Sequence, residues 1–272
     1  MRADVRCVLA VVGIAAGVVA GPTGTSAAAA SQPHDFAIAS VLPAPGATVG
    51  VAHPVVVTFD APVANRQAAE RAIAVKSTPA MTGTFEWLDN NVVQWVPAHY
   101  WPAHSTVGLS VEGRPTEFKT GPKVVGVANI TDHTFTVSVD GVDAVPPTPH
   151  HRPHFGEEGV LPASMGRPEF PTPVGNYTVL SKDRSVLMDS SSVGIPVDDP
   201  SGYLLNVDYA VRITNRGLFV HSAPWAVQSL GLENVSHGCI SLSPEDAEWY
   251  YNTVNVGDPV IVKQDLWERP PS

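Results

Sequence analysis

The stretch GLFVHSAPW (residues 217–225) and the stretch SHGCI (residues 236–240) decide how the C-terminal half of this chain is interpreted. The first ends a predicted strand in a polar loop that carries His221. The second begins another element fifteen positions after that histidine and carries Cys239. Elsewhere, 26 Pro and 22 Gly punctuate short apolar runs, which is typical of strands and turns rather than of long helices. We therefore expect a folded, mainly β protein.

Cys239 and His221 have the chemistry of a nucleophile and its base. The thiolate is the form of cysteine that attacks, and an unperturbed thiol with a pKa of ~8.5 is mostly protonated at neutral pH. An imidazole within hydrogen-bonding reach can take that proton. Gly238 leaves the backbone before the cysteine open, so that its amide and that of Cys239 can point at a developing oxyanion. These parts are those of acyl transfer through a thioester.

The N-terminus has the pattern of a secretory signal. Arg2 and Arg6 precede an apolar run at residues 7–21, and a stretch of small residues follows at 25–30. We expect cleavage before Ser31 and export of the rest. An uncleaved membrane anchor is the alternative, and it is disfavoured because the run is shorter than the roughly 20 residues that a span needs.

Removal of residues 1–30 changes both the charge and the cysteine content. The formal net charge moves from −10 to −11 because two arginines and one aspartate leave. An acidic body without basic clusters argues against nucleic acid and anionic lipid as partners. Cys7 also leaves, so Cys239 is the only cysteine of the mature chain. Exported proteins usually pair their cysteines, and a lone one is either an inert buried thiol or a reactive one. The neighbouring residues favour a reactive thiol.

A short leader at residues 31–40 precedes a predicted immunoglobulin-like β-sandwich at residues 41–120. Apolar side chains alternate at residues 55–59 and 107–111, and turn residues separate the runs. Nothing in this region resembles a catalytic constellation. Three histidines lie in proline-rich turns there and are most simply solvated: His53, His99 and His104.

The region 122–263 is predicted to form a second β domain, followed by a tail at 264–272. Alternating apolar residues at 135–139 end at Asp140-Gly141, a dipeptide that favours hairpin turns. Further strands are expected at 176–181, 207–214, 217–221 and 258–263.

One helix is predicted directly after the cysteine. Ser243 can cap it, Pro244 suits its first position, and two acidic residues complement the positive end of the helix dipole. An apolar stripe then follows at i, i+3, i+4 and i+7, comprising Ala247, Tyr250, Tyr251 and Val254. We expect a mainly antiparallel β domain with this helix packed against it.

The motif SHGC, with His221 upstream at the usual distance, resembles the signature of the YkuD-type L,D-transpeptidases. The similarity extends over about residues 123–262 and includes PTPVGNY (171–177), MDSS (188–191) and HSAPW (221–225). The chain also resembles the mycobacterial members, in which immunoglobulin-like domains precede the catalytic domain. An isolated HGC would be a weak signal, whereas this set of motifs is specific.

The resemblance implies a role for each residue of the site. Cys239 would be the nucleophile, His221 the base, and the Ser222 carbonyl would orient the imidazole. His237 and Gly238 would line the oxyanion region with Cys239, although His237 is open between direct catalysis and loop structure. The remaining residues would support the loop or contact substrate, with Tyr203 in a lid over the site: Ser236, Tyr203, Met188 and Trp225.

The implied reaction belongs to peptidoglycan biosynthesis in the cell envelope, on the periplasmic side of the plasma membrane. A tetrapeptide stem would donate its acyl group and lose the terminal D-Ala. The side-chain amine of a diamino acid on another stem would accept it, giving a 3→3 cross-link. Carbapenems, whose strained ring mimics the donor, would act as inhibitors. We expect no cofactor, no metal and a monomer.

Two departures from the family pattern stand out. Family members often carry Asn or Arg two positions after the nucleophile, where this chain has Ser241, so one stabilising contact is in doubt. The connection at 145–160 is also longer than usual and contains three histidines that suggest a metal site, although histidines between prolines are usually solvated. These are His150, His151 and His154.

Two other functions compete with the transpeptidase. An L,D-carboxypeptidase would form the same thioester and release it to water, and the sequence does not separate the two, because they differ in how well an acceptor is held and water excluded. A non-catalytic protein that merely binds the wall belongs to another class. The intact Cys239 and His221 argue against it.

Overall fold

The computed structural model describes residues 36–146 and 157–265. The predicted signal at 1–30, half of the leader, most of the C-terminal tail and the three histidines at 150, 151 and 154 lie outside these ranges. Within them, no helix combines the length and the apolar character that crossing a bilayer requires.

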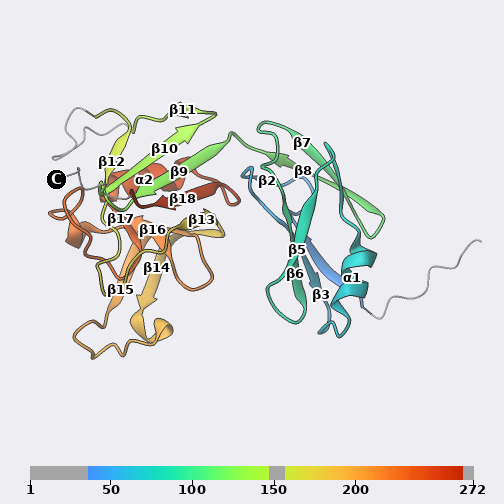
Figure 1. Ribbon diagram of the computed structural model, residues 1–272, viewed down its shortest axis with the longest axis horizontal. Helices are drawn as coiled ribbons and strands as arrows, with labels where there is room; N and C mark the ends of the chain where they lie inside the picture. Colours follow the sequence, from blue (N-terminus) through green and yellow to red (C-terminus); the bar gives the residue numbers. More distant parts are fainter. Residues whose placement is uncertain (1–35, 147–156, 266–272) are drawn as a thin grey trace, which may run out of the picture. The chain divides into compact units, whose positions relative to one another are not determined.

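The N-terminal domain is a sandwich of two four-stranded sheets, as the alternating pattern predicts (Figure 1). Strand β3 shows why: its odd residues are buried and its even residues are half-buried, so one face turns to the core. One sheet has the order β1 (Ile38–Leu42), β3 (Val55–Phe59), β6 (Val92–Pro97) and β5 (Gly83–Trp87). The other has the order β2 (Thr48–Val49), β8 (Arg114–Thr120), β7 (Thr106–Val111) and β4 (Lys76–Thr78).

Two features of this domain differ from expectation. A short helix, α1 (Arg66–Ile73), was not predicted; the Asn65 side chain accepts a hydrogen bond from the Ala68 amide at 3.0 Å and so caps it. The expectation that His53 is solvated is wrong. Its side chain is buried, its Nδ1 lies 2.6 Å from the Pro54 carbonyl oxygen, and burial lowers its pKa. His99 and His104 are exposed, as expected.

The C-terminal domain also contains two sheets. The six-stranded sheet has the order β11 (Val142–Asp143), β10 (Thr134–Val139), β9 (Val124–Asn129), β18 (Pro259–Lys263) and β13 (Gly175–Thr178), with β12 (Val160–Pro162) paired to β10. The four-stranded sheet has the order β14 (Ser181–Asp189), β15 (Leu204–Arg212), β16 (Phe219–Ser222) and β17 (Ile240–Leu242). Most neighbours are antiparallel, as predicted, but β9–β18 and β16–β17 are parallel pairs.

The strand predictions hold with one instructive exception. The hairpin turn forms at Asp140-Gly141, and both residues have the positive φ that such turns require. The single strand expected at 176–181 is instead two, because β13 ends at Thr178 and β14 begins at Ser181 in the other sheet. The chain therefore crosses between the two sheets at this point.

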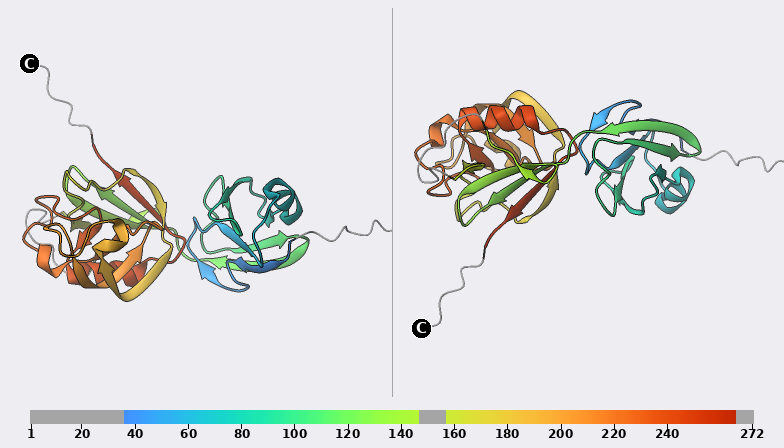
Figure 2. Two further views of the ribbon diagram at one scale, coloured as in Figure 1. Left: turned by 90° about the horizontal axis from the view of Figure 1, so that it is seen from below. Right: turned by 90° about the horizontal axis from the view of Figure 1, so that it is seen from above.

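Helix α2 (Pro244–Thr253) forms where it was predicted. The Ser243 hydroxyl accepts a hydrogen bond from the Asp246 amide at 3.1 Å, and Pro244 occupies the first turn. Of the predicted stripe, Ala247, Tyr250 and Val254 are buried in the core, whereas Tyr251 is only partly buried. The helix contacts β15 and β16, and Figure 2 shows it from two further sides.

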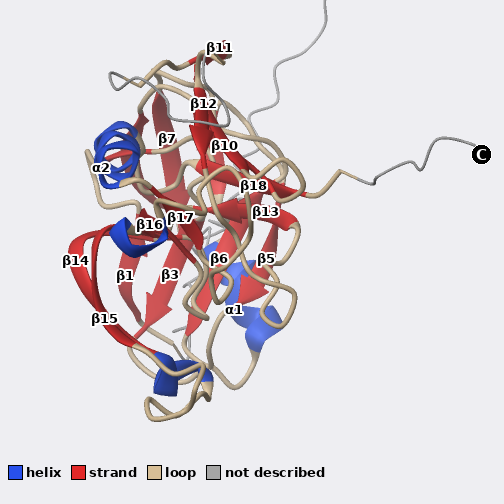
Figure 3. Cartoon of the chain, turned by 90° about the vertical axis from the view of Figure 1, so that its left-hand side faces the viewer, coloured by secondary structure: helices blue, strands red, loops and turns tan. Residues whose placement is uncertain are grey.

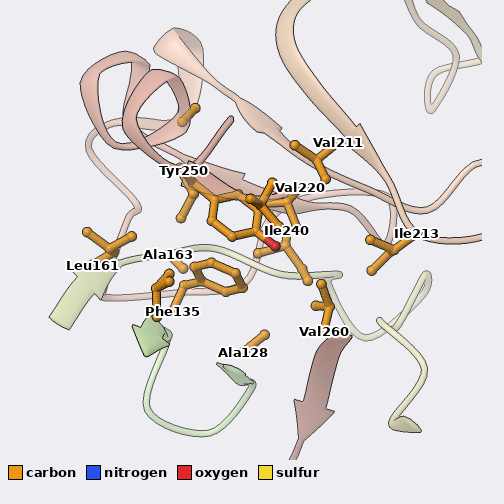
Figure 4. Close-up of a cluster of buried hydrophobic side chains, with 14 of the residues drawn as sticks. Ala128, Phe135, Leu161, Ala163, Val211, Ile213, Val220, Ile240, Tyr250 and Val260 are labelled. Atoms are coloured by element: carbon orange, nitrogen blue, oxygen red, sulfur yellow. The ribbon is translucent and has the colours of Figure 1, made fainter. Parts of the chain in front are cut away.

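The ring of Tyr250 is the main anchor of α2. It meets the ring of Phe135 edge-on at a centroid distance of 4.9 Å, and Figure 4 shows it beside Val220 and Ile240 of strands β16 and β17. Gly126 of β9 lies under both rings. A Cβ there would be 2.7 Å from Phe135 Cζ and 3.2 Å from the Tyr250 hydroxyl oxygen. The core behind β16 and β17 is therefore closely packed.

Gly126→Ala is expected to lower the free energy of unfolding by about 1–3 kcal/mol, the usual cost of overpacking a core. Neither buried ring can swing into solvent to relieve the overlap. Gly108→Ala is the matched control, because it is also a strand glycine and its nearest foreign atom, Thr78 Cβ, would lie at an ordinary 3.7 Å. Thermal unfolding measures both. Equal effects of the two substitutions would contradict this account of the core.

Candidate active site

The parallel pairing of β16 with β17 brings the two predicted catalytic residues to one face of a sheet. Val220 pairs with Ile240 and His221 with Ser241. Cys239 directly precedes β17, and its thiol faces the backbone amide of Phe219. Because alternate residues of a strand share a face, and paired residues of parallel strands do too, Cys239 and His221 project to the same side.

A pocket of about 320 Å³ lies over this face. Its lining includes seven of the residues that the sequence singles out, together with Ser241, which departs from the family pattern. Ser222 and Gly238 do not line it but lie next to residues that do. The seven are Met188, Tyr203, His221, Trp225, Ser236, His237 and Cys239.

His221 is held as a neutral base. Its ring is buried, and its Nδ1–H donates to the Ser222 carbonyl oxygen at 2.7 Å, as the resemblance implied. That bond leaves Nε2 as a proton acceptor. Burial lowers the pKa of His221 to about 4, against the smaller opposing effect of the Ser222 carbonyl. Trp225, in the short helix η2 (Pro224–Ala226), stacks near the imidazole at a centroid distance of 6.1 Å.

Cys239 is held as a thiol. Burial raises its pKa to about 11, while the Phe219 amide and the charge of Arg212 act in the opposite direction. Its Sγ lies 3.6 Å from the Gly217 carbonyl oxygen. With a thiol pKa near 11 and an imidazole pKa near 4, the resting pair is uncharged. Both shifts favour the neutral forms, so the arrangement suits general-base catalysis that starts from uncharged groups.

The loop before the nucleophile is fixed by Ser236. Its hydroxyl donates to the Cys239 carbonyl oxygen at 2.7 Å and accepts from the Gly238 amide at 3.0 Å. Gly238 has a φ of +115°, which requires glycine. The Gly238 amide, expected to face an oxyanion, is thus already engaged. The Cys239 amide donates no hydrogen bond within the described ranges, and it is the better oxyanion donor.

The His237 ring contacts Arg167, Phe170, Ser201 and Tyr203. Its Nε2 accepts a hydrogen bond from Arg167 Nη2 at 3.0 Å, and its other edge faces the Ser201 carbonyl. Phe170 and Tyr203 lie at centroid distances of 4.9 and 5.0 Å. Burial, followed by the charge of Arg167, lowers the pKa of His237. This geometry favours loop structure over proton transfer.

Two side chains that support the site had no role assigned from the sequence. The buried Thr172 hydroxyl donates to the Gly238 carbonyl oxygen at 2.7 Å and accepts from the Gly166 amide at 2.8 Å. The sequence could have indicated Thr172 as a site residue, because it lies in the PTPVGNY motif. Arg167 contacts His237 and also the Ser201 hydroxyl at 3.2 Å, yet it belongs to none of the motifs.

Residues 190–203, which we call the lid, connect β14 to β15 at the end of a long hairpin (Figure 3). The lid begins with the short helix η1 (Ser190–Val193), and the Ser190 hydroxyl accepts from the Tyr203 amide at 3.0 Å. Gly194 ends η1 with a φ of +86°. Gly202 packs so closely on the Pro196 and Val197 carbonyls that no Cβ would fit. The lid is a compact, internally bonded loop that places Tyr203 over the pocket.

Comparison with known proteins agrees with this geometry. Residues 14–117 match the model of a bacterial Ig domain, and residues 125–262 match the L,D-transpeptidase catalytic domain. The chain belongs to the L,D-transpeptidase family. It is 72% identical over 271 residues to probable L,D-transpeptidase 3 of Mycobacterium tuberculosis, covering 97% of this chain and 100% of that one. It is 48% identical to L,D-transpeptidase 1 of the same organism, covering 96% and 99%.

Solved structures of transpeptidases give the same result. L,D-transpeptidase 3 of M. tuberculosis in complex with a faropenem-derived adduct matches with a TM-score of 0.80 and 76% identity, over 84% of this chain and 98% of that one. The transpeptidase LdtMt1 in complex with imipenem matches with a TM-score of 0.76 and 50% identity, over 84% and 99%. The predicted family and fold class are confirmed.

The raised pKa of Cys239 predicts how the thiol of this transpeptidase titrates. Its alkylation by iodoacetamide should rise about tenfold per pH unit between pH 7 and 10, because the thiolate reacts and the pKa of about 11 keeps the thiol protonated across that range. The urea-unfolded chain is the control, and its rate should level off above pH ~9 because a free thiol has a pKa of ~8.5. Mass spectrometry follows the adduct. A pH-independent rate in the folded protein would reveal a preformed thiolate.

Proposed function

We propose that this L,D-transpeptidase joins peptidoglycan stem peptides by 3→3 cross-links through a thioester on Cys239. The observation that carries the proposal is the pairing of β16 with β17, which places a thiol and a neutral imidazole on one face of one pocket. Such a pair suits an acyl transfer that begins from uncharged groups.

The first half-reaction forms the thioester. The Cys239 sulfur attacks the carbonyl carbon of the donor peptide bond, and the thiol proton passes to His221 Nε2. The Cys239 amide donates to the oxyanion that forms. When the carbon–nitrogen bond breaks, His221 returns its proton to the departing amine, so that free D-Ala leaves and both residues regain their starting protonation.

The second half-reaction resolves the thioester. The side-chain amine of a diamino acid attacks, and His221 takes a proton from that amine. His221 then passes the proton to the departing Cys239 sulfur, so the thiol is restored as the carbon–sulfur bond breaks. An L,D-carboxypeptidase would use water in place of the amine. The lid, fastened to the loop of His237 through Arg167, favours the amine because Tyr203 lies over the pocket and restricts the access of water to the thioester.

We further propose that the enzyme works outside the cytoplasm, in the cell envelope, after export directed by residues 1–30. The sequence pattern of a secretory signal supports this location. The chemistry supports it as well. Exchange of one amide for another through a thioester needs no nucleotide, so the reaction can proceed where none is supplied.

Imipenem should acylate Cys239 in the native chain, and Cys239→Ala should form no adduct while keeping its fold. His221→Gln should slow acylation by roughly two or more orders of magnitude, as loss of a general base typically does. His237→Gln is the matched histidine control and should retain far more activity, because its Nε2 is occupied by Arg167. Intact-protein mass spectrometry measures the adduct, and circular dichroism checks the fold. If His237→Gln is the slower variant, the base has been assigned wrongly.

Incubation with a disaccharide tetrapeptide should give cross-linked dimer faster than free tripeptide. The bond should join two diamino-acid residues, and free D-Ala should appear in equal amount. Chromatography separates the products and tandem mass spectrometry places the bond. If only free tripeptide is released at millimolar donor and acceptor, the enzyme should be assigned as an L,D-carboxypeptidase and not as a transpeptidase.

A further inference from the structure

A second cavity, of about 240 Å³, lies next to the catalytic pocket. The two cavities share Met188 and Tyr203 as wall residues. The second cavity does not include Cys239, but it includes Gly217, whose carbonyl oxygen is 3.6 Å from the Cys239 sulfur. We call it the arginine cavity, because Arg212 and Arg216 both line it. Its edge is thus one backbone group away from the nucleophile.

The two arginines carry charge that the protein does not neutralise. Neither guanidinium forms an ion pair or a hydrogen bond with any residue in the described part of the chain. Arg212 is half-buried and rests on the ring of Phe219 at 4.3 Å, which fixes its position. Arg216 lies exposed on the loop between β15 and β16. Burying a charge without a partner is costly, so an unpaired arginine in a cavity suits an anionic ligand.

One carboxylate opposes them. Asp189 also lines the arginine cavity, and its Oδ1 accepts a hydrogen bond from the Ser191 amide at 2.8 Å as the cap of η1. The lining therefore carries two positive charges and one negative charge, and the negatively charged Asp189 is hydrogen-bonded to the lid through the Ser191 amide. A single carboxylate on a ligand would balance the remaining charge.

We propose that the arginine cavity binds the terminal carboxylate of the donor stem, on the residue that leaves. The inference rests on the proposed function. That carboxylate is one residue beyond the bond that Cys239 attacks, a distance of about 3.5 Å along the chain. With the scissile carbonyl at the sulfur, a carboxylate at this distance enters the edge of the arginine cavity at Gly217, where the long arginine side chains can bind it with paired N–H donors. The cavity thereby selects donors with a free C-terminus.

The first test needs no peptidoglycan. Iodoacetate and iodoacetamide alkylate the same thiol and differ in one carboxylate, so the ratio of their rates with Cys239 reports on anion binding beside the sulfur. Arg212→Gln/Arg216→Gln should lower the iodoacetate-to-iodoacetamide ratio at least fivefold, and Arg216→Gln alone should lower it less. Arg184→Gln is the control, because Arg184 also rests on an aromatic ring, that of Tyr209, outside the cavity. Its ratio should stay within twofold of the native chain.

The second test uses a tetrapeptide stem and its C-terminal carboxamide as donors. The native chain should prefer the free acid by about tenfold in kcat/KM, since a hydrogen bond to a charged group contributes on that order. The double variant should lose the preference, mainly by losing activity toward the acid. An unchanged alkylation ratio overturns the proposal, as does a lowered ratio with an unchanged preference for the acid. If the native chain consumes neither donor, the proposed transpeptidase function fails, and the proposal for the arginine cavity fails with it, whatever the alkylation ratio.

Discussion

The register between β16 and β17 is the constraint on which the site depends. Side chains alternate along a strand, so a shift of one residue would turn the thiol of Cys239 away from the face that carries His221. The packed core behind these strands holds the register, because Val220 and Ile240 lie against the ring of Tyr250 (Figure 4). Helix α2 thus supports the proposed catalytic pair without lining the pocket, because it keeps both strands in place.

Burial shifts the pKa values of Cys239 and His221, the two groups proposed to react, in opposite directions. It raises the pKa of the thiol and lowers that of the imidazole, so both favour their neutral forms at neutral pH. In the proposed mechanism, charge then appears only when the substrate is attacked. The Cys239 amide is available to meet that charge, whereas the Gly238 amide already holds the Ser236 hydroxyl. The loop is therefore arranged before substrate arrives, which is the condition for effective electrostatic stabilisation.

The local patterns predicted the fold well, and the site only in part. Alternation located the strands, and the cap at Ser243 located α2, because these signals depend on neighbouring residues. The split near residue 179, the burial of His53 and the parallel pairs depend on contacts between distant segments, which no local pattern contains. For the same reason Cys239 and His221 were found by motif, while Arg167 and Arg212 were not. Arg167 contacts His237 of another loop and Arg212 contacts Phe219 of the neighbouring strand, and no sequence spacing predicts either contact.

The neutral state of Cys239 also bears on how long the enzyme lasts. Oxidants attack thiolates far faster than thiols, and Cys239 forms no disulfide within the described part of the chain. In the proposed location outside the cytoplasm, a permanently ionised Cys239 would be open to oxidation to sulfenic and sulfinic acids between turnovers. A thiol that ionises only as it attacks stays protonated, and therefore unreactive toward oxidants, between turnovers. Desolvation, which makes the resting sulfur a poor nucleophile, thereby preserves it for the next substrate.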